Sequence, residues 1–146
     1  MLLYVDLNCF NRPFDDQSQA RIARETEAVL SILQRIVDGV DQLAWSAVLR
    51  FENSRHPLLD RCNEIARWGE LAAVNVSISR KLASRAEELV DTGLAPLDAA
   101  HLASAEAAAC DCLLTCDDRL MRKGRNLHLS FKLLNPVEYW EECTHA

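Results

Sequence analysis

The sequence contains no apolar run long enough to cross a membrane. Charged residues interrupt its longest apolar segments, whereas a membrane-spanning helix needs about 20 consecutive apolar residues. The first ten residues, MLLYVDLNCF, lack the basic segment that opens an export signal, and they already include an aspartate. We therefore expect a cytoplasmic protein that makes no contact with membranes.

Glycine and proline are also scarce, with four residues of each among 146. Collagen-like repeats and low-complexity segments need far more of both. Hydrophobic residues make up 49% of the chain and charged residues 26%, which is the usual balance of a globular protein. Since the length suits one domain, we expect a single domain that spans residues 1–146.

Basic residues are too few to give the chain an overall positive charge. Lysine and arginine number 16 against 22 acidic residues, and the net charge is -6. A protein that coats duplex DNA by charge alone is expected to be basic. A nucleic-acid partner would therefore have to bind through a local basic patch, or through metal ions in an acidic pocket.

Several motifs of well-known chemistries are missing. The chain has no GxSxG, P-loop or GxGxxG pattern, so acyl transfer, nucleotide hydrolysis and dinucleotide binding lack their usual markers. The cysteines do not follow CxxC spacing, and no histidine lies at the distance typical of a zinc finger. Without an export signal, we predict free, buried thiols rather than disulfides or a zinc site. The six thiols are Cys9, Cys62, Cys110, Cys112, Cys116 and Cys143.

Four short runs rich in apolar residues are predicted to be strands, and the first, which shows no alternation of polar and apolar residues, suits a strand that is covered on both faces. The runs cover residues 2–5, 43–45, 112–115 and 129–134. Residues 7–13 are interpreted as a turn. Residues 71–78 are ambiguous, although Val74, Val76 and Ile78 alternate with other residues and permit a short extended piece.

Amphipathic segments between these runs predict helices. The clearest covers residues 18–37 and ends at Gly39, since glycine tolerates the left-handed conformation at a helix C-terminus. Further helices are expected after Ser46, over residues 58–68, 79–90, 96–109 and 119–124, and from Pro136 onward. Strands that alternate with helices predict an α/β fold, a three-layer α/β/α sandwich around a central parallel sheet.

Four carboxylates lie where strands end or where the next helix begins. Asp6 ends the first strand, Asp117 follows the third, Glu52 lies on the helix after the second, and Asp98 lies in a first helical turn. Because ligands bind at the carboxyl ends of the strands in open α/β sheets, the four could converge at one edge. Taken singly, Asp98 is explained by the helix dipole and Asp6 by turn formation.

Four converging acids would require a cation. Two carboxylates about 4–5 Å apart repel each other by about 3–4 kcal/mol at an effective dielectric constant of about 20. Carboxylate oxygens are hard ligands that suit Mg²⁺ or Mn²⁺ better than zinc. Such ions lower the pKa of a bound water and offset the charge that builds up on a phosphodiester during in-line attack.

Four segments of the chain have a recognisable pattern, namely YVDLN (4–8), SAVLRFE (46–52), LDAAHLASA (97–105) and LLTCDDRL (113–120). They correspond to a strand ending in Asp with Asn two residues later, a strand-end Ser before a helical Glu, an Asp opening an alanine-rich helix, and Thr-x-Asp before a short helix. Together they resemble the motifs of the PIN domain family, metal-dependent ribonucleases that include toxins of bacterial toxin–antitoxin pairs, and LNPVEY (134–139) resembles the family's ending. Leu7 and Leu120 depart from the pattern.

The resemblance implies a metal-dependent endoribonuclease whose catalytic residues hold Mg²⁺ or Mn²⁺ and position the attacking water, namely Asp6, Glu52, Asp98 and Asp117. Three neighbours would hold a carboxylate or a metal-bound water by hydrogen bonds, namely Asn8, Ser46 and Thr115. It also implies an RNA substrate, an antitoxin partner and a homodimer, for which helices 18–37 and 58–68 offer apolar surface. The alternative is a nuclease-inactive PIN-like module that binds RNA or a protein.

The densest basic stretch of the chain follows Asp117. Arg119, Arg122 and Lys123 are candidates to bind RNA phosphates, or they only offset the negative end of a helix dipole. Asp118, the neighbour of the predicted ligand, is expected to cap the next helix instead of binding metal.

His101 lies one helical turn after Asp98. We predict that it packs in the helix interface with one nitrogen bonded, which is the commoner fate of such a histidine, and that it does not face the pocket. Asp15 and Asp16, in an insertion after the first strand, receive no role.

Overall fold

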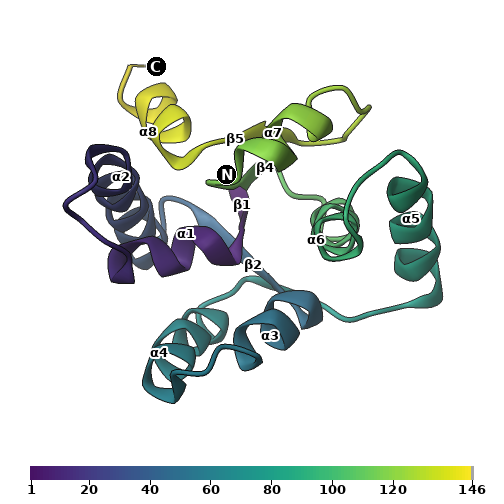
Figure 1. The fold of residues 1–146 in the computed structure, drawn as a ribbon, viewed down its shortest axis with the longest axis horizontal. Coiled ribbons are helices and arrows are strands. Elements are labelled where there is room, and N and C mark those ends of the chain that lie inside the picture. Colours follow the sequence, from purple (N-terminus) through teal and green to yellow (C-terminus); the bar gives the residue numbers. More distant parts are fainter. Residues whose placement is uncertain (146) are drawn as a thin grey trace.

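Five short strands form one parallel sheet at the centre of the molecule, which the computed structural model describes over residues 1–145 (Figure 1). The strands are β1 (Leu2–Val5), β2 (Gln42–Ser46), β3 (Val74–Val76), β4 (Cys112–Leu114) and β5 (Lys132–Leu134). Their order across the sheet is β3-β2-β1-β4-β5. The register aligns Leu3 with Leu43 on one side and with Cys112 on the other.

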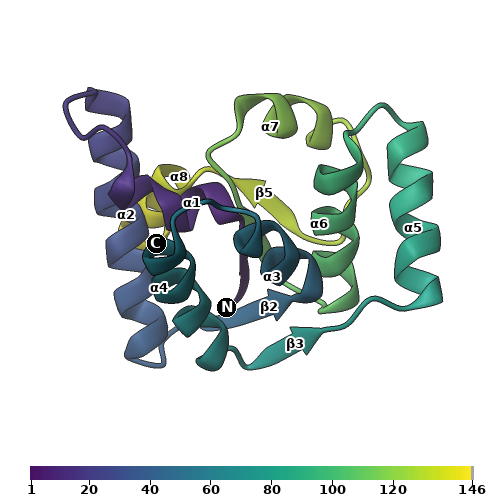
Figure 2. The same ribbon diagram turned by 60° about the horizontal axis from the view of Figure 1, so that its bottom comes forward.

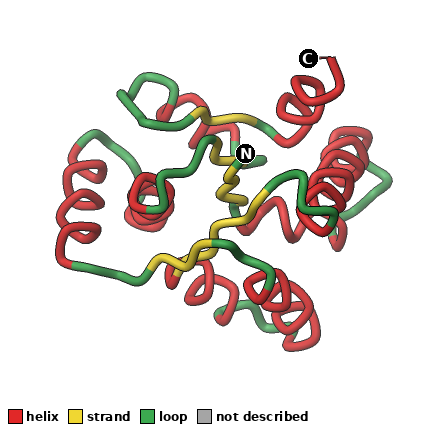
Figure 3. Tube along the Cα trace, turned by 180° about the vertical axis from the view of Figure 1, so that it is seen from behind, coloured by secondary structure: helices red, strands yellow, loops and turns green. Residues whose placement is uncertain are grey.

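Eight α-helices surround the sheet. They are α1 (Leu7–Asn11), α2 (Ala20–Val37), α3 (Ala47–Ser54), α4 (Leu59–Glu70), α5 (Arg80–Asp91), α6 (Pro96–Ala107), α7 (Asp118–Gly124) and α8 (Pro136–His145). Figure 1 shows α2 and α8 on one side of the sheet and α5 and α6 on the other, and Figure 3 shows the same strip of strands between helices from behind. The predicted three-layer α/β/α sandwich with a parallel sheet is confirmed.

The sheet is buried on both faces, which explains why its strands are apolar without alternation. Leu3, Tyr4, Leu43, Ala44 and Leu113 have no exposed surface. The central strands therefore supply the middle of the hydrophobic core, and polar residues lie just beyond the ends of these strands.

Three elements differ from the expectation. The segment after β1 is not a turn but the helix α1 followed by a short 3-10 helix (Arg12–Phe14), and Asp6 caps α1 by accepting a hydrogen bond from the Leu7 N–H. The ambiguous segment contains β3, which makes a fifth strand. The last strand is shorter than predicted, because only Lys132–Leu134 pair with β4.

The order of the strands creates a crevice between β1 and β4. The chain moves from β1 outward to β2 and β3, and then returns across the sheet to β4 on the other side of β1. At such a topological switch point the connections leave in opposite directions, and ligands bind there at the carboxyl ends of the strands. In Figure 2 the chain rises from the N-terminus through β1 into α1, and α7, which follows β4, lies at the same upper level.

A buried carboxylate ties α2 to two other parts of the chain. Glu25 is 2% exposed and accepts hydrogen bonds from Arg12 Nε (2.9 Å), Arg21 Nε (3.4 Å) and Asn135 Nδ2 (2.5 Å). Arg12 belongs to the 3-10 helix, and Asn135 lies immediately before α8. This contact set fixes both segments against α2.

None of the helices in residues 1–145 is both long and apolar enough to cross a membrane.

Candidate metal centre

Asp6 is the first residue after β1, and three donors fix its carboxylate. Its Oδ1 accepts from the Leu7 N–H (2.8 Å), and its Oδ2 accepts from Asn8 Nδ2 (3.1 Å) and Thr115 Oγ1 (2.8 Å). Thr115 follows β4, so the hydrogen bond crosses the crevice between β1 and β4. Asp6 is therefore held in one orientation at the switch point of the sheet.

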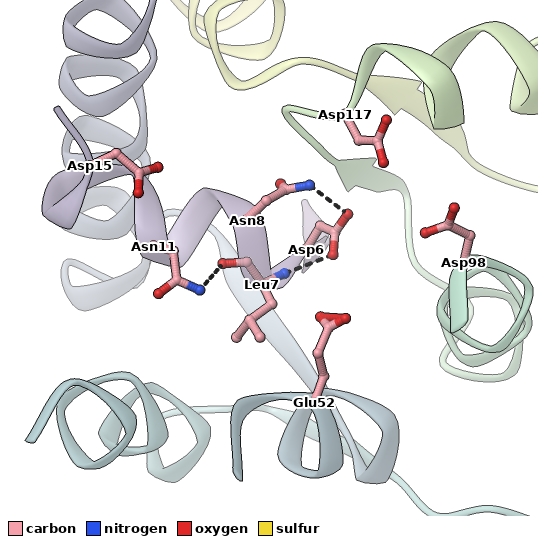
Figure 4. A pocket seen from close by; sticks show the side chains of 8 residues that line it. All are labelled: Asp6, Leu7, Asn8, Asn11, Asp15, Glu52, Asp98 and Asp117. Atoms are coloured by element: carbon pink, nitrogen blue, oxygen red, sulfur yellow. Dashed lines mark hydrogen bonds between the residues drawn. The ribbon is translucent and has the colours of Figure 1, made fainter. Parts of the chain in front are cut away.

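The four carboxylates predicted from the sequence line one pocket (Figure 4). The pocket, here called the acidic pocket, has a volume of about 330 Å³ and is lined by Asp6, Leu7, Asn8, Asn11, Asp15, Glu52, Asp98 and Asp117. In Figure 4 the side chains of Asp6, Glu52, Asp98 and Asp117 point toward a common space, while Asp15 lies apart from them. Segments more than 100 residues apart in the chain thus bring their carboxylates together.

The loop from β4 to α7 is held from both sides. Asp117 caps α7, because its Oδ1 accepts from the N–H groups of Arg119 (2.9 Å) and Leu120 (3.2 Å). The prediction that Asp118 caps this helix is wrong: Asp118 pairs instead with Arg21 of α2 through two hydrogen bonds of 2.7 and 2.8 Å. The two neighbouring aspartates thus have different partners: Asp117 binds the first N–H groups of α7, and Asp118 binds Arg21 of α2.

Negative charge accumulates in the acidic pocket and changes the pKa of two of its acids. Burial raises the pKa of Asp6 above its ordinary value, and the charge of Glu52 adds to this, although His101 and the Thr115 hydroxyl oppose it. Burial also raises the pKa of Asp98, and the charges of Asp6 and Asp117 raise it further. The metal-free pocket therefore resists full ionisation.

Replacement of Asp98 by Asn is expected to stabilise the metal-free protein at neutral pH. A carboxyl group with a raised pKa in the folded state counts against folding once the pH rises through that pKa, and this penalty is absent below the ordinary value of about 4. Melting temperatures in EDTA should be higher for Asp98→Asn than for wild type at about pH 7.5, by roughly 3 °C per kcal/mol relieved. The difference should shrink toward about pH 4. A difference that is constant with pH would contradict the assigned repulsion.

His101 is buried, as predicted, but both of its nitrogens are bonded and its Nε2 lies beside two carboxylates of the acidic pocket. Its Nε2 lies 3.3 Å from Glu52 Oε1 and 4.0 Å from Asp6 Oδ1, and its Nδ1 lies 2.7 Å from the Tyr4 hydroxyl. Burial alone would lower the pKa of His101, but the hydrogen bond to Glu52 and the charges of nearby carboxylates raise it. The one-turn spacing from Asp98 was the sequence signal for this position.

Residues 3–126 match the family model of the PIN domain. The chain belongs to the PIN domain family. The matched segment includes all four carboxylates of the acidic pocket and leaves β5 and α8 outside it.

Two solved structures share the fold of this PIN domain. A chain in the crystal structure of FitAcB from Neisseria gonorrhoeae has a TM-score of 0.59 and 18% identity, with 93% of this chain and 98% of that chain covered. A chain of VapBC2 from Rickettsia felis, bound to a DNA fragment from their promoter, has a TM-score of 0.58 and 14% identity, with 92% and 98% covered. Among curated proteins, none matches the sequence significantly. At these identities, the likeness to solved structures concerns the fold.

The three predicted supporting residues of the PIN domain differ in what they contact. Asn8 and Thr115 both donate to Asp6, and Asn8 also donates to Thr115 (3.2 Å). Ser46 makes no hydrogen bond with a carboxylate among residues 1–145. Its Oγ accepts from the Leu49 N–H (3.0 Å) as the cap of α3 and contacts the Tyr4 hydroxyl (2.7 Å).

Asp15 and Asp16, which had no role in the sequence, occupy different positions. Asp15 lines the acidic pocket at its rim and is held by Arg12 (3.0 Å) and Arg61 (3.4 Å). Asp16 is exposed and accepts hydrogen bonds from the Ser18 N–H and hydroxyl. The insertion therefore adds a fifth carboxylate to the pocket wall, but with its charge already paired.

The basic residues of α7 are exposed and are engaged to different degrees. Arg119 and Arg122 form no ion pair within the described part of the chain, whereas Lys123 donates to the Gly93 carbonyl oxygen (2.8 Å). Arg125, two residues beyond Lys123, pairs with Glu138. Two cations beside Asp117 thus remain available to a negatively charged ligand.

The donor set of the acidic pocket fits a hard divalent cation. Its four inward carboxylates supply oxygen ligands, and one atom each of Asp6, Glu52 and His101 lie within 4.8 Å of one another. No cysteine lines the pocket, so the soft ligands that favour zinc are missing from its wall. Mg²⁺ and Mn²⁺ are bound by such carboxylates.

The cysteines are free thiols, as predicted, and all except the partly exposed Cys143 are buried. Cys9 and Cys116 lie behind the acidic pocket with their sulfur atoms 3.7 Å apart. Burial raises the pKa of the Cys9 thiol well above its ordinary value, so it stays protonated and unreactive.

Proposed function

We propose that this PIN domain is an endoribonuclease that hydrolyses RNA phosphodiesters with Mg²⁺ or Mn²⁺ in the acidic pocket. The metal would be held by Asp6, Glu52, Asp98 and Asp117, and it would supply an activated water and positive charge for the leaving phosphodiester oxygens. The observation that carries the proposal is the convergence of these four carboxylates at the switch point between β1 and β4. Membership of the PIN domain family supports the same conclusion.

The four carboxylates would have different roles at the metal because they approach it from different elements. Asp6 is fixed by Leu7, Asn8 and Thr115, so it can keep one oxygen geometry while a metal binds or leaves. Glu52 and Asp98 lie on helices and approach from two other sides, and Asp117 closes the pocket from the β4–α7 loop. A phosphodiester bound in the pocket would lie close to the start of α7, because Asp117 caps this helix.

A fluorogenic RNA tests this function directly. We expect cleavage with Mn²⁺ or Mg²⁺, no cleavage with excess EDTA, and a rise in melting temperature with Mn²⁺, because a ligand that binds only the folded state stabilises it. If Mn²⁺ raises the melting temperature but no RNA is cut, the protein is the alternative, an inactive PIN-like module that binds RNA or a protein. If Mn²⁺ neither binds nor supports cleavage, the proposal is wrong.

Exposed cations of α7 are proposed to bind the RNA backbone. Alanine at both Arg119 and Arg122 should weaken RNA binding and reduce the slope of log affinity against log salt by about 1.4, which is about 0.7 for each of two phosphate contacts to a single strand, because fewer counterions are released when the variant binds. Fluorescence anisotropy at several salt concentrations measures the slope. The control is Arg67→Ala: Arg67 is an exposed cation in the last turn of α4, near the start of β3 and so at the opposite edge of the sheet. Equal slopes for both variants would exclude the α7 surface.

A protein partner is also proposed. The two similar solved structures belong to toxin–antitoxin complexes, and an acidic pocket is a natural target for a small basic inhibitor. We infer that this protein acts in the cytoplasm as the toxin of such a pair. A short reading frame for a DNA-binding antitoxin directly upstream of its gene would support this. The protein should then cut RNA when it is free and should not cut RNA when it is in complex with the antitoxin.

A homodimer is proposed on the basis of exposed apolar side chains. Leu30 and Val37 of α2 are 52% and 56% exposed, and Leu58 and Leu59 at the start of α4 are 57% and 71% exposed. Large exposed apolar patches mark interaction sites, and we propose that these side chains contribute to one. Sedimentation of the purified protein measures its oligomeric state.

A further inference from the structure

Tyr4 is a tyrosine in the centre of the sheet whose hydroxyl does not reach the surface. Its side chain is fully buried in β1, and the hydroxyl lies 2.7 Å from Ser46 Oγ and 2.7 Å from His101 Nδ1. Burial raises the pKa of Tyr4 far above its ordinary value, so the hydroxyl keeps its proton. A buried hydroxyl between two polar partners acts as a donor to one and an acceptor from the other.

The opposite nitrogen of His101 faces two carboxylates. Nε2 is 3.3 Å from Glu52 Oε1 and 4.0 Å from Asp6 Oδ1. An ionised carboxylate can only accept hydrogen bonds, so the contact with Glu52 is favourable only when Nε2 carries a hydrogen. This holds for the neutral imidazole and for the imidazolium alike.

A hydrogen on Nε2 determines which groups donate in the other hydrogen bonds between His101, Tyr4 and Ser46. In the neutral imidazole Nδ1 then has a lone pair, which the Tyr4 hydroxyl satisfies. Ser46 in turn donates to Tyr4, while its oxygen accepts from the Leu49 N–H (3.0 Å). Every hydroxyl hydrogen from Ser46 to Glu52 has an acceptor in this arrangement, as buried polar groups require.

We propose that Ser46, Tyr4 and His101 form a positioning relay, in which His101 donates its Nε2–H to Glu52 and does not bind the metal. Asp6, Glu52 and His101 are grouped as closely as the ligands of a metal site. The relay gives the histidine of this group a different role, as a hydrogen-bond donor to Glu52. The lone pair that a metal would need points into the core, toward Tyr4. The relay depends on the proposed function only in that it treats Glu52 as a metal ligand.

The relay connects three elements that carry the acidic pocket. Tyr4 precedes Asp6 in β1, Ser46 caps the helix that carries Glu52, and His101 follows Asp98 by one turn of α6. A change at Tyr4 should therefore alter Glu52 without direct contact. This is the behaviour of a positioning residue, because Tyr4 itself is closed off from the pocket.

The first test observes the imidazole directly. In protein labelled with ¹⁵N-histidine, at a pH at which His101 is neutral, long-range ¹H–¹⁵N spectra should show the Nε2–H tautomer, and Mg²⁺ should leave it unchanged. Tyr4→Phe keeps the ring but removes the donor to Nδ1, so the Nε2–H tautomer should persist because Glu52 still accepts from it, while the ¹⁵N signal of Nδ1 should shift as its lone pair loses the hydrogen bond from Tyr4. An Nδ1–H tautomer in the wild type, or one nitrogen that responds to Mg²⁺ as a ligand, overturns the proposal. The result does not depend on whether RNA is cut.

The second test separates a donor from a ligand. His101→Gln retains an N–H donor, whereas His101→Leu removes it, and thermal melting confirms that each variant is folded. Mn²⁺ titrations should give a dissociation constant for His101→Gln within about threefold of wild type, and about 10-fold weaker binding for His101→Leu. RNA cleavage by Tyr4→Phe should show a lower kcat at an unchanged KM. Equal and larger losses of Mn²⁺ affinity in both His101 variants would identify a ligand, and no loss in either would leave only a packing role; both results overturn the relay.

Discussion

Replacing Asp6 with Asn is expected to abolish metal-dependent RNA cleavage and the stabilisation of the protein by Mn²⁺. Asp6 is the carboxylate that three donors hold at the switch point, and an amide in its place removes a charge and one metal-binding oxygen. Mutation of a residue that only hydrogen-bonds to a metal ligand typically lowers metal affinity or activity by about 10–100-fold. Loss of the ligand itself should therefore lower kcat/KM by at least about 100-fold. Cleavage of a fluorogenic RNA and melting curves with and without Mn²⁺ measure both effects.

The matched control for Asp6→Asn is Asp16→Asn. Asp16 is an exposed aspartate in the insertion after β1 that lies outside the acidic pocket, and its carboxylate accepts hydrogen bonds from the Ser18 N–H and hydroxyl. It should keep the wild-type rate and the full response to Mn²⁺. Cleavage that persists in Asp6→Asn at the level of this control would point to a contaminating nuclease and would exclude the acidic pocket as the site.

Replacing Glu25 with Ala is expected to destabilise the fold more than any surface change. Glu25 is buried and holds Arg12, Arg21 and Asn135, so its removal leaves Arg12 Nε and Asn135 Nδ2 without their acceptor next to a small cavity, whereas Arg21 keeps its pair with Asp118. Breaking a buried ion pair by removing one partner costs about 3–5 kcal/mol. Since a domain is stable by about 5–15 kcal/mol, this is a large share of the total. Denaturant unfolding measures the loss.

Two variants of the same helix provide the comparison. Glu27→Ala changes an exposed glutamate of α2 and should stay within about 0.5 kcal/mol of wild type. Glu25→Gln keeps the shape of the side chain and part of the hydrogen bonding, so its loss of unfolding free energy should lie between those of Glu27→Ala and Glu25→Ala. If Glu25→Ala were no more destabilising than Glu27→Ala, the buried network would contribute nothing to stability.

The positions of the four carboxylates could be predicted because they depend on local sequence. An apolar run that ends in Asp6, and Thr115 with Asp117 two residues later, place acids just beyond the ends of β1 and β4. Pro96 at the first position of α6 places Asp98 in its first turn. Each of these is a short-range pattern, and short-range patterns determine where strands end and helices begin.

The errors concern residues whose partners are far away in the chain. The helix α1 has five residues, too few for a periodic pattern, and it is fixed by packing of Phe10 against Trp45 at 5.7 Å between ring centres. Asp117 caps α7, whereas Asp118 pairs with Arg21, 97 residues earlier in the chain. The Thr-x-Asp spacing singles out Asp117 as the candidate ligand, but nothing in the local sequence predicts the partner of Asp118.

By itself, the sequence determined the alternation of strands and helices and the kind of ligands at the strand ends, because hydrophobic periodicity and capping act over a few residues. Only the tertiary structure decided that β1 lies between β2 and β4, which sets Thr115 on Asp6 and turns His101 toward Glu52. The reason is that contacts between remote segments follow from how the layers pack, and packing depends on the whole chain at once.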